Sequence, residues 1–201
     1  MARPRLHDAA LRARLLDVAS RAISQHGEGA VTVRSVAADA GTSPSAVYAL
    51  YGSRDELVAA VSAEGFRRFA AHLASAPRTD DAAADLAGLG GAYRAFALAD
   101  PHFYAVMFSR GVRPGRDVDG AVDRAVDEPT FLVLRDAVAR VLPDAAPPAV
   151  EDAALGLWGL VHGLVSLELA GLVPGDEAAR AARYAGAARA VGRALVTPTA
   201  G

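Results

Sequence analysis

The chain has 201 residues, of which 52% are hydrophobic and 22% are charged, and its formal net charge at pH 7 is −2. This composition supports a buried core and is unlike that of a disordered chain. Cysteine is absent from the sequence, which excludes disulfides, thiolate metal sites and cysteine nucleophiles. The amino-terminal sequence MARPRLHDAALRARLL lacks the continuous apolar segment of a signal peptide, so we expect a cytoplasmic protein.

Positive charge is concentrated at the amino-terminal end. All 21 basic residues are arginine. Residues 1–54 contain seven arginines and four carboxylates, a formal charge of +3, whereas residues 55–201 contain fourteen and nineteen, a formal charge of −5. A basic amino-terminal segment followed by an acidic remainder indicates that a polyanion contacts the amino-terminal segment only.

Hydrophobic residues recur at helical spacing almost throughout, and the sequence has no convincing alternating run, so we predict an all-α fold. The stop signal HGEG ends a first helix over 8–25. Thr32 is expected to cap a second helix over 33–40. Ser43 followed by Pro44 begins a short third helix, because proline loses nothing where the N–H is already unpaired.

The fourth helix is predicted over 54–74, with Ser53 and Glu56 forming a capping box at its start. The segment SAPRTDD then reads as a linker, and Gly/Pro-containing breaks separate the later elements. Further helices are expected at 80–99, 101–109, 122–142, 148–171 and 176–196, with a glycine-rich loop at 111–121.

One apolar run, Leu155 to Val173, has the length of a membrane span. His162, Ser166 and Glu168 lie inside it, and a charge near the centre of a bilayer costs about 2.5–3.5 kcal/mol. We therefore interpret the run as a buried helix and expect no membrane association.

Residues 33–50 meet the requirements of a helix-turn-helix. A small residue on the first helix and a glycine in the turn allow the two helices to cross closely, and an apolar residue on the second fills the gap. Ala37, Gly41 and Val47 take these places at offsets of four and six. The residues predicted to face inward are Val33, Val36, Ala37, Val47 and Leu50.

The opposite face of the third helix is predicted to contact DNA. Small outward residues let a helix enter the major groove, and a tyrosine reaches a phosphate or a base methyl group. Helix starts at Thr32 and Ser43 offer N–H groups to phosphate, and Arg54 is expected to add a phosphate contact. The role of Tyr51, packing or phosphate contact, stays open. The predicted DNA-binding residues are Arg3 and Arg5 as a minor-groove arm, with Thr32, Arg34, Thr42, Ser43, Pro44, Ser45, Tyr48, Tyr51 and Arg54.

Residues 8–57 resemble the DNA-binding region of TetR-family transcriptional regulators. The matching segments are LLDVASRAISQHG and AVTVRSVAADAGTSPSAVYALYGSRDELV, with Tyr48 at the tyrosine of the recognition helix. Tyr51 stands where phenylalanine is usual, and Arg54 replaces a lysine. Ser35 stands where an acid is commoner, which is expected to weaken a capping box.

The resemblance implies a homodimer that binds a roughly palindromic DNA operator. Residues 1–56 would be the helix-turn-helix DNA-binding domain, and residues 57–201 a helical effector-binding and dimerisation domain. The resemblance implies a ligand-responsive regulator, most often a repressor, released by a small effector. We expect no cofactor. The alternatives are an activator or a helical interaction protein that keeps the helix-turn-helix as a scaffold.

Two stripes lie side by side in the run around Trp158. One is mostly large and apolar, and the other consists of small residues that allow close helix approach. The last helix carries a similar small face, and the resemblance implies a four-helix dimer interface. Trp158, His162 and Gly163 are also similar to the W…HG signature of one TetR carboxy-terminal subgroup. The predicted interface residues are Gly156, Gly159, Gly163, Ser166, Ala181, Ala185, Ala188 and Gly192.

The segment YRAFALADPHFYAVMF is the best candidate for an effector pocket, although the same side chains also build ordinary cores. Its shortage of charge predicts an apolar or aromatic effector. His162 is either a core or interface residue or a ligand contact, and no metal site is expected because no second histidine lies at i+3 or i+4. The predicted effector contacts are Tyr93, Phe96, Phe103, Met107, Phe108, Phe131, Trp158 and His162.

An enzyme is not expected from this sequence. It has no phosphate loop, nucleophile elbow or paired His–carboxylate helix. The GLGG at 88–91 lies in a helical pattern without a preceding strand, so it is no dinucleotide fingerprint.

Overall fold

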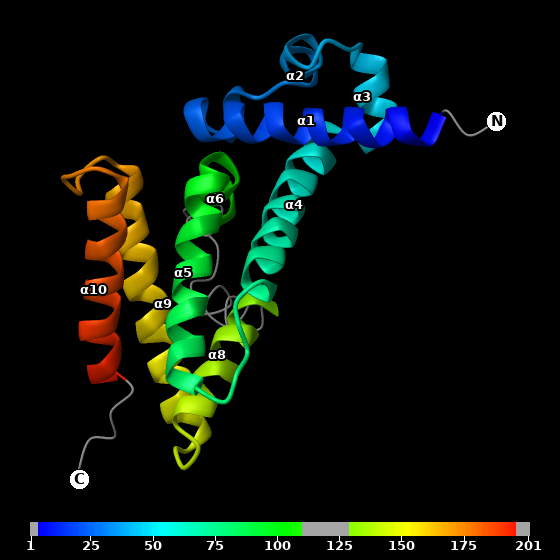
Figure 1. Ribbon diagram of the computed structural model, residues 1–201. Coiled ribbons are helices and arrows are strands. Elements are labelled where there is room, and N and C mark those ends of the chain that lie inside the picture. The colour runs from blue at the N-terminus through cyan, green and yellow to red at the C-terminus, as the bar shows by residue number, and fades with distance from the viewer. Residues whose placement is uncertain (1–3, 110–128, 196–201) are drawn as a thin grey trace. The chain divides into compact units, whose positions relative to one another are not determined.

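The computed structural model describes residues 4–109 and 129–195, and every regular element within them is helical (Figure 1). The predicted all-α class is confirmed for this part of the chain. In chain order, the elements are α1 (Pro4–His26), the short 3₁₀ helix η1 (Glu28–Ala30), α2 (Val33–Asp39), α3 (Pro44–Tyr51), α4 (Arg54–Ala74), α5 (Ala82–Ala99), α6 (Pro101–Ser109), α8 (Pro129–Val141), α9 (Pro147–Leu169) and α10 (Glu177–Leu195).

The helix boundaries lie within a few residues of those predicted. The largest difference is at the start of α1, which begins at Pro4 rather than near residue 8. The predicted loop 111–121 and the first part of the helix predicted over 122–142 lie outside the described residues.

Contacts divide the described residues into two compact units. Unit 1 comprises residues 4–68 with 100–109, and unit 2 comprises residues 69–99 with 129–195. The division falls inside α4, whereas the sequence had suggested a domain boundary at 56/57. Unit 1 therefore includes most of α4 and also α6, which lies far along the chain from the helix-turn-helix.

Unit 1 is built around the buried faces of α1 to α4. The core between these four helices consists mostly of aliphatic side chains, which let short helices pack closely. The fully buried members of this core are Leu15, Ala19, Val36, Val47, Leu57, Val58 and Val61. The close approach of α6 to α4 needs Gly65, because a Cβ atom there would lie 2.8 Å from both Cγ and Sδ of Met107.

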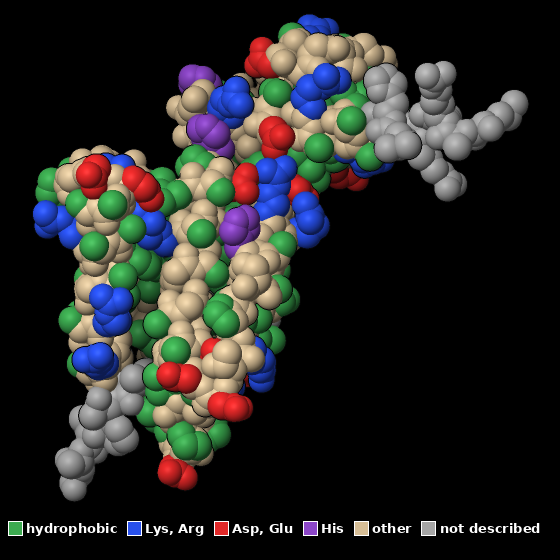
Figure 2. Space-filling view, in the orientation of Figure 1, with side chains coloured by type: hydrophobic (Ala, Val, Ile, Leu, Met, Phe, Trp, Pro, Cys, Tyr) green, Lys and Arg blue, Asp and Glu red, His purple; other side chains and the backbone are tan. Residues whose placement is uncertain are grey.

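A cluster of charged side chains joins three segments of unit 1. The guanidinium of Arg68 donates to Asp17, Glu64 and Asp100, each at 2.8 Å, and lies 4.2 Å from the ring centroid of Phe103. These partners belong to α1, α4 and the α5–α6 junction, so one arginine connects elements that are distant in sequence. Figure 2 shows acidic and basic side chains intermixed on the visible face of unit 1.

Unit 2 consists of the end of α4 with α5, α8, α9 and α10. The facing sides of α8 and α9 form a core of Phe131, Val138, Val150, Ala153, Ala154 and Leu157. A second, aromatic contact joins α4 to α5, where Phe69 stacks on Phe96 at 5.0 Å and meets Tyr93 edge-on at 5.2 Å.

A buried ion pair connects α5, α9 and α10 in unit 2. Arg94 donates two hydrogen bonds to the carboxylate of Glu168, at 2.8 and 2.6 Å, and a third to Glu177 at 3.0 Å. The side chain of Glu168 is 4% exposed, and Arg94 holds its pKa below the usual value through these hydrogen bonds. Glu168 is therefore a paired core residue of α9.

By length and composition alone, α9 would also qualify as a membrane-spanning helix, and 28% of its most apolar window is buried inside the structure. The same helix supplies four residues of the α8–α9 core, namely Val150, Ala153, Ala154 and Leu157, whereas α8 supplies Phe131 and Val138.

Candidate nucleic-acid interface

The turn between α2 and α3 has the geometry that the sequence predicted. Gly41 has φ +64°, which favours glycine, and Thr42 donates its N–H to the carbonyl of Ala37 at 2.8 Å. Ala37 and Val47 are 1% and 0% exposed. The residues predicted to face inward are therefore buried as expected, except that Leu50 is half-buried.

Both helices begin with side-chain caps. At α2, Thr32 Oγ1 accepts from the N–H of Ser35 at 3.1 Å, and Ser35 Oγ accepts from the N–H of Thr32 at 3.2 Å. Ser35 therefore completes the capping box at the position where an acid is commoner. Its hydroxyl is a neutral acceptor, so the expectation that this box is weaker than one with a carboxylate stays a prediction. At α3, Ser43 Oγ accepts from the N–H of Ala46 at 3.2 Å.

The outward face of α3 is solvent-exposed. Tyr48 is 53% exposed, and Pro44, Ser45 and Ala49 are also exposed. The hydroxyl of Ser45 lies 2.9 Å from that of Ser43, so it forms part of the helix cap. The side chains that this helix offers to a partner are therefore mostly apolar or aromatic.

The structure places Arg54 differently from the sequence expectation. Its guanidinium donates to the backbone carbonyl of Val31 at 2.8 Å and to that of Glu28, and it pairs with Asp55 at 2.7 Å. Arg54 thus holds the segment between α1 and α2 against the start of α4. Its expected role as a phosphate contact competes with these internal hydrogen bonds.

Tyr51 packs against α1. Its hydroxyl donates to the backbone carbonyl of Arg12 at 3.2 Å, and the Arg12 guanidinium carbon lies 5.6 Å from its ring centroid. Burial raises the pKa of the Tyr51 hydroxyl. Of the two roles left open by the sequence, the geometry supports packing, and Arg12 is a guanidinium beside α3 that local spacing did not reveal.

The remaining predicted DNA contacts are spread around the helix-turn-helix. Thr32 and Arg34 are exposed at the start of α2, and Thr42 is half-buried in the turn. Arg5 falls within α1, whereas Arg3 lies outside the described residues.

Comparison with known proteins gives two matches to family models. Residues 15–61 match bacterial regulatory proteins of the tetR family, and residues 86–192 match the tetracyclin repressor-like C-terminal domain. The second model alone covers more than half of the chain. This chain belongs to the TetR family of transcriptional regulators.

Solved structures agree with this family membership. A protein described as a candidate regulator, SCO4313, is 30% identical, with 95% of this chain and 98% of that chain covered and a TM-score of 0.69. A TetR-like transcriptional regulator from Rhodococcus sp. RHA1 is 21% identical, with 94% and 98% covered and a TM-score of 0.71. A search of curated proteins found no match.

In this TetR-family chain, the predicted effector contacts fall in both units. In unit 2, the Tyr93 hydroxyl lies 3.1 Å from Nδ1 of His162, and Phe131 lies 5.8 Å from Trp158. Tyr93, Phe96 and Phe131 are all at most 5% exposed. Burial lowers the pKa of His162, which favours its neutral form.

The other three predicted contacts belong to unit 1. Phe103 lies beneath the Arg68 guanidinium, Met107 lies beside Gly65, and Phe108 packs edge-on against Tyr104 at 4.9 Å. The single cavity suggested by the sequence thus corresponds to side chains that the contacts assign to two separate units.

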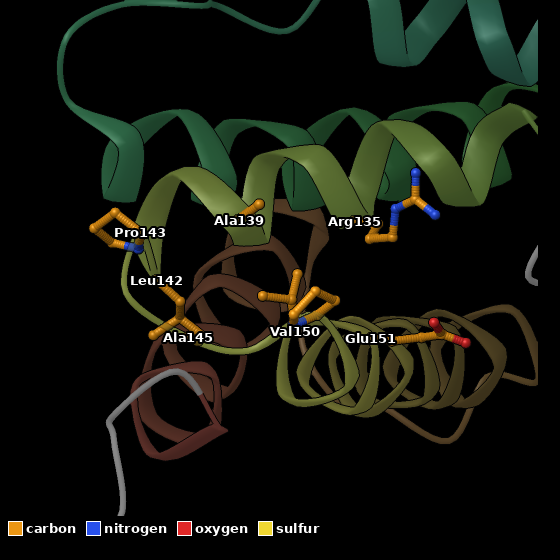
Figure 3. Close-up of a pocket in the computed structure, with 8 residues that line it drawn as sticks. Arg135, Ala139, Leu142, Pro143, Ala145, Val150 and Glu151 are labelled. Carbon is orange, nitrogen blue, oxygen red and sulfur yellow. The ribbon is translucent and has the colours of Figure 1, made fainter.

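A surface depression lies elsewhere in unit 2, between the end of α8 and the start of α9 (Figure 3). It has a volume of about 270 Å³, and its lining includes the apolar residues Leu142 and Val150 and the charged residues Arg135 and Glu151. None of the predicted effector contacts lines this depression.

The predicted dimer-interface residues differ in their surroundings within the chain. A Cβ atom at Gly159 or Gly163 would meet nothing within 4 Å, so this face of α9 is open. A Cβ at Gly192 would lie 3.3 Å from Leu157, so Gly192 takes part in packing α10 against α9. The others, Gly156, Ser166, Ala181, Ala185 and Ala188, are half-buried.

Potential metal ligands are dispersed over the described residues. No group of three or more potential metal ligands occurs within residues 4–109 and 129–195. The proteins that this chain resembles are regulators of transcription.

Proposed function

We propose that this protein is a ligand-responsive repressor that binds a palindromic operator as a homodimer in the cytoplasm and is released by a small apolar or aromatic effector. The observation that supports it most is the exposed face of α3, which follows α2 through a tight turn at Gly41. The chain also matches the TetR family over this region. A helix with small outward residues enters the major groove without steric conflict.

Dimerisation supplies the second head that a palindromic operator requires. The open α9 face at Gly159 and Gly163 suits close approach by a second copy, because glycine lets helix backbones come near each other. In a two-fold symmetric dimer, the α3 helices of the two subunits would lie in successive major grooves of the operator.

The effector is proposed to bind in unit 2 near Tyr93 and His162. The Tyr93 hydroxyl and Nδ1 of His162, 3.1 Å apart, are polar groups that a ligand could bind. The aromatic rings of Phe69 and Phe96 lie next to Tyr93. A neutral imidazole both donates and accepts a hydrogen bond, so it suits an uncharged ligand. Release of DNA then requires that the effector binds the DNA-incompetent state more tightly.

The competing hypothesis is an interaction protein that keeps the helix-turn-helix as a scaffold. An activator is a further alternative that shares the DNA-binding step. Tyr48 is 53% exposed on a face of α3 whose other exposed residues are small, and an aromatic ring in this place can reach a phosphate or a base methyl group, which favours DNA binding.

The decisive experiment is a gel-shift titration with the DNA upstream of the protein's own gene. We expect binding whose affinity falls steeply as salt rises, because phosphate contacts release counterions. A Tyr48→Ala variant should lose affinity while keeping the helical content of the wild type. Absent or salt-insensitive binding would contradict the proposal, and a reporter gene fused to the bound DNA distinguishes repression from activation.

A further inference from the structure

The surface of α3 contains no charge. Its sequence is PSAVYALY, and the exposed members are Pro44, Ser45, Tyr48 and Ala49. Ser45 is within hydrogen-bond distance of the capping Ser43, at 2.9 Å. A pyrrolidine ring, a methyl group and an aromatic ring therefore dominate the face that points away from the core.

Base recognition in the major groove depends mainly on paired donors and acceptors. Arginine reads guanine, and asparagine or glutamine reads adenine, each through two hydrogen bonds. None of these side chains occurs on α3. The apolar feature of the major groove is the C5 methyl group of thymine, which small apolar or aromatic side chains contact.

Arg34 is the exception among the two helices of the motif. It is exposed on α2, and neither α2 nor α3 contains another arginine, lysine, asparagine or glutamine. Arg34 is thus the one side chain of these helices that can make a bidentate contact to O6 and N7 of guanine.

We propose that two kinds of base contact read each operator half-site. Ala49 and Tyr48 contact thymine methyl groups, and Arg34 contacts one guanine. Phosphate contacts position the head on the duplex without reading base edges, and the remaining specificity comes from sequence-dependent DNA shape. This inference rests on the proposed function, since it names the class of DNA that the same surface recognises.

The test begins with selection of bound duplexes from a random library by the full-length protein. Each thymine of the selected half-site is then replaced by deoxyuridine, which removes only the methyl group and leaves the protein unchanged. We expect about a fourfold loss of affinity at one or two positions, since burial of one methyl group has this effect. Deoxyuridine outside the half-sites should have no effect.

A double-mutant cycle assigns the methyl contact to a side chain. Ala49→Gly removes the protein methyl group, and its effect on helix stability cancels within the cycle. If Ala49 contacts thymine, deoxyuridine at that position should cost less affinity in the Ala49→Gly protein than in the wild type. Circular dichroism confirms that the variant is folded.

A parallel cycle addresses Arg34. Replacing the selected guanine by 7-deazaguanine removes N7, and we expect about a tenfold loss of affinity that is absent in Arg34→Ala. Arg14, exposed on α1, provides the matched control, because Arg14→Ala removes a guanidinium from the same unit. The control should leave the discrimination at that guanine unchanged.

The outcomes separate this inference from the proposed function. If selection yields no enriched sequence, and the protein shows no salt-dependent binding, the proposed function fails. If a sequence is enriched but deoxyuridine and 7-deazaguanine leave affinity unchanged, the protein binds DNA and the proposed mode of readout is wrong. Loss at the predicted positions with coupling to Ala49 and Arg34 supports it.

Discussion

The hydroxyl of Tyr51 donates a hydrogen bond to the backbone carbonyl of Arg12, 3.2 Å away, and the Arg12 guanidinium lies over the Tyr51 ring. This contact ties the last turn of α3 to α1. Tyr48, one helical turn earlier, is 53% exposed. Two tyrosines three residues apart therefore have different roles, one in the fold and one on the surface.

Substitution of these two tyrosines should separate stability from binding. Tyr51→Ala removes a half-buried ring and is expected to lower the free energy of unfolding by about 2–4 kcal/mol. Tyr48→Ala should change it by less than about 0.5 kcal/mol and weaken DNA binding instead. Urea denaturation and gel shifts measure the two effects. A stable Tyr51→Ala protein that fails to bind DNA would instead identify Tyr51 as a DNA contact.

Arg54 is expected to act mainly through stability. Arg54→Ala deletes its hydrogen bonds to the carbonyls of Val31 and Glu28, which should cost about 1.5–3 kcal/mol. Arg34→Ala is the matched control, because Arg34 is exposed and its loss should leave the melting temperature unchanged. If Arg54→Ala melts like the wild type yet binds DNA weakly, its phosphate contact dominates.

These residues show how far the sequence predicts the fold and the site. The inward positions of α2 and α3 followed from periodicity over a few turns, because Ala37, Gly41 and Val47 lie within eleven residues of one another in the sequence. The acceptors of Arg54 and Tyr51 are backbone carbonyls 23 to 39 residues away. No spacing rule identifies such partners, since they depend on how α1 packs in three dimensions.

The same reasoning explains what was missed in unit 2. Periodicity identified the small-residue stripe that includes Gly192, but it could not say that this glycine would face Leu157 of the same chain. Likewise, Glu168 was recognised as a charge in an apolar helix, but its partner Arg94 is 74 residues away. A stripe on a helix predicts that a neighbour exists and leaves its identity open.

Unit 1 should lose stability in acid through Glu64. Hydrogen bonds from Arg67 and Arg68 hold the pKa of Glu64 at about 2, against a usual value of 4.5. Because the folded-state pKa is the lower one, the stabilisation is complete above about pH 4.5 and disappears as the pH falls towards 2. After allowance for solvent screening, we expect it to contribute roughly 1–2 kcal/mol.

Urea denaturation between pH 7 and pH 3 measures this contribution. Glu64→Gln should lower stability at pH 7 and reduce its slope with pH below 4.5. Asp39→Asn, at an exposed carboxylate of the same unit, provides the control and should keep the wild-type slope. An unchanged slope in Glu64→Gln would show that other carboxylates determine the acid response.

Removing one partner of the Arg94–Glu168 pair should lower stability much more than replacing both partners by apolar residues. Arg94→Ala leaves a carboxylate that is 4% exposed with Arg180 as its remaining partner, 3.5 Å away, so we expect a loss of about 2–4 kcal/mol. Arg94→Met combined with Glu168→Leu removes both charges and should recover most of that loss. Thermal denaturation of the three proteins measures the difference. A double variant no more stable than Arg94→Ala would mean that the ion pair itself stabilises unit 2.

A bulky residue at Gly163 tests the proposed dimer. A Cβ atom at this position meets nothing within 4 Å, so Gly163→Leu should fit the fold of a single chain. If a second copy packs against this face, the added side chain separates the two backbones, and we expect the dimer to dissociate at concentrations where the wild type is paired. Sedimentation velocity measures the change directly.

Gly91 on α5 supplies the control for this experiment. A Cβ there also meets nothing within 4 Å, and Gly91 lies outside the proposed interface. Gly91→Leu should therefore sediment like the wild type, which shows that a leucine in an exposed helix does not by itself disturb assembly. A fully dimeric Gly163→Leu protein would move the interface away from this face of α9. If Gly163→Leu loses both the dimer and operator binding, operator binding requires the dimer that forms through this face of α9. The reason is that a single DNA-binding head reaches only half of a palindrome.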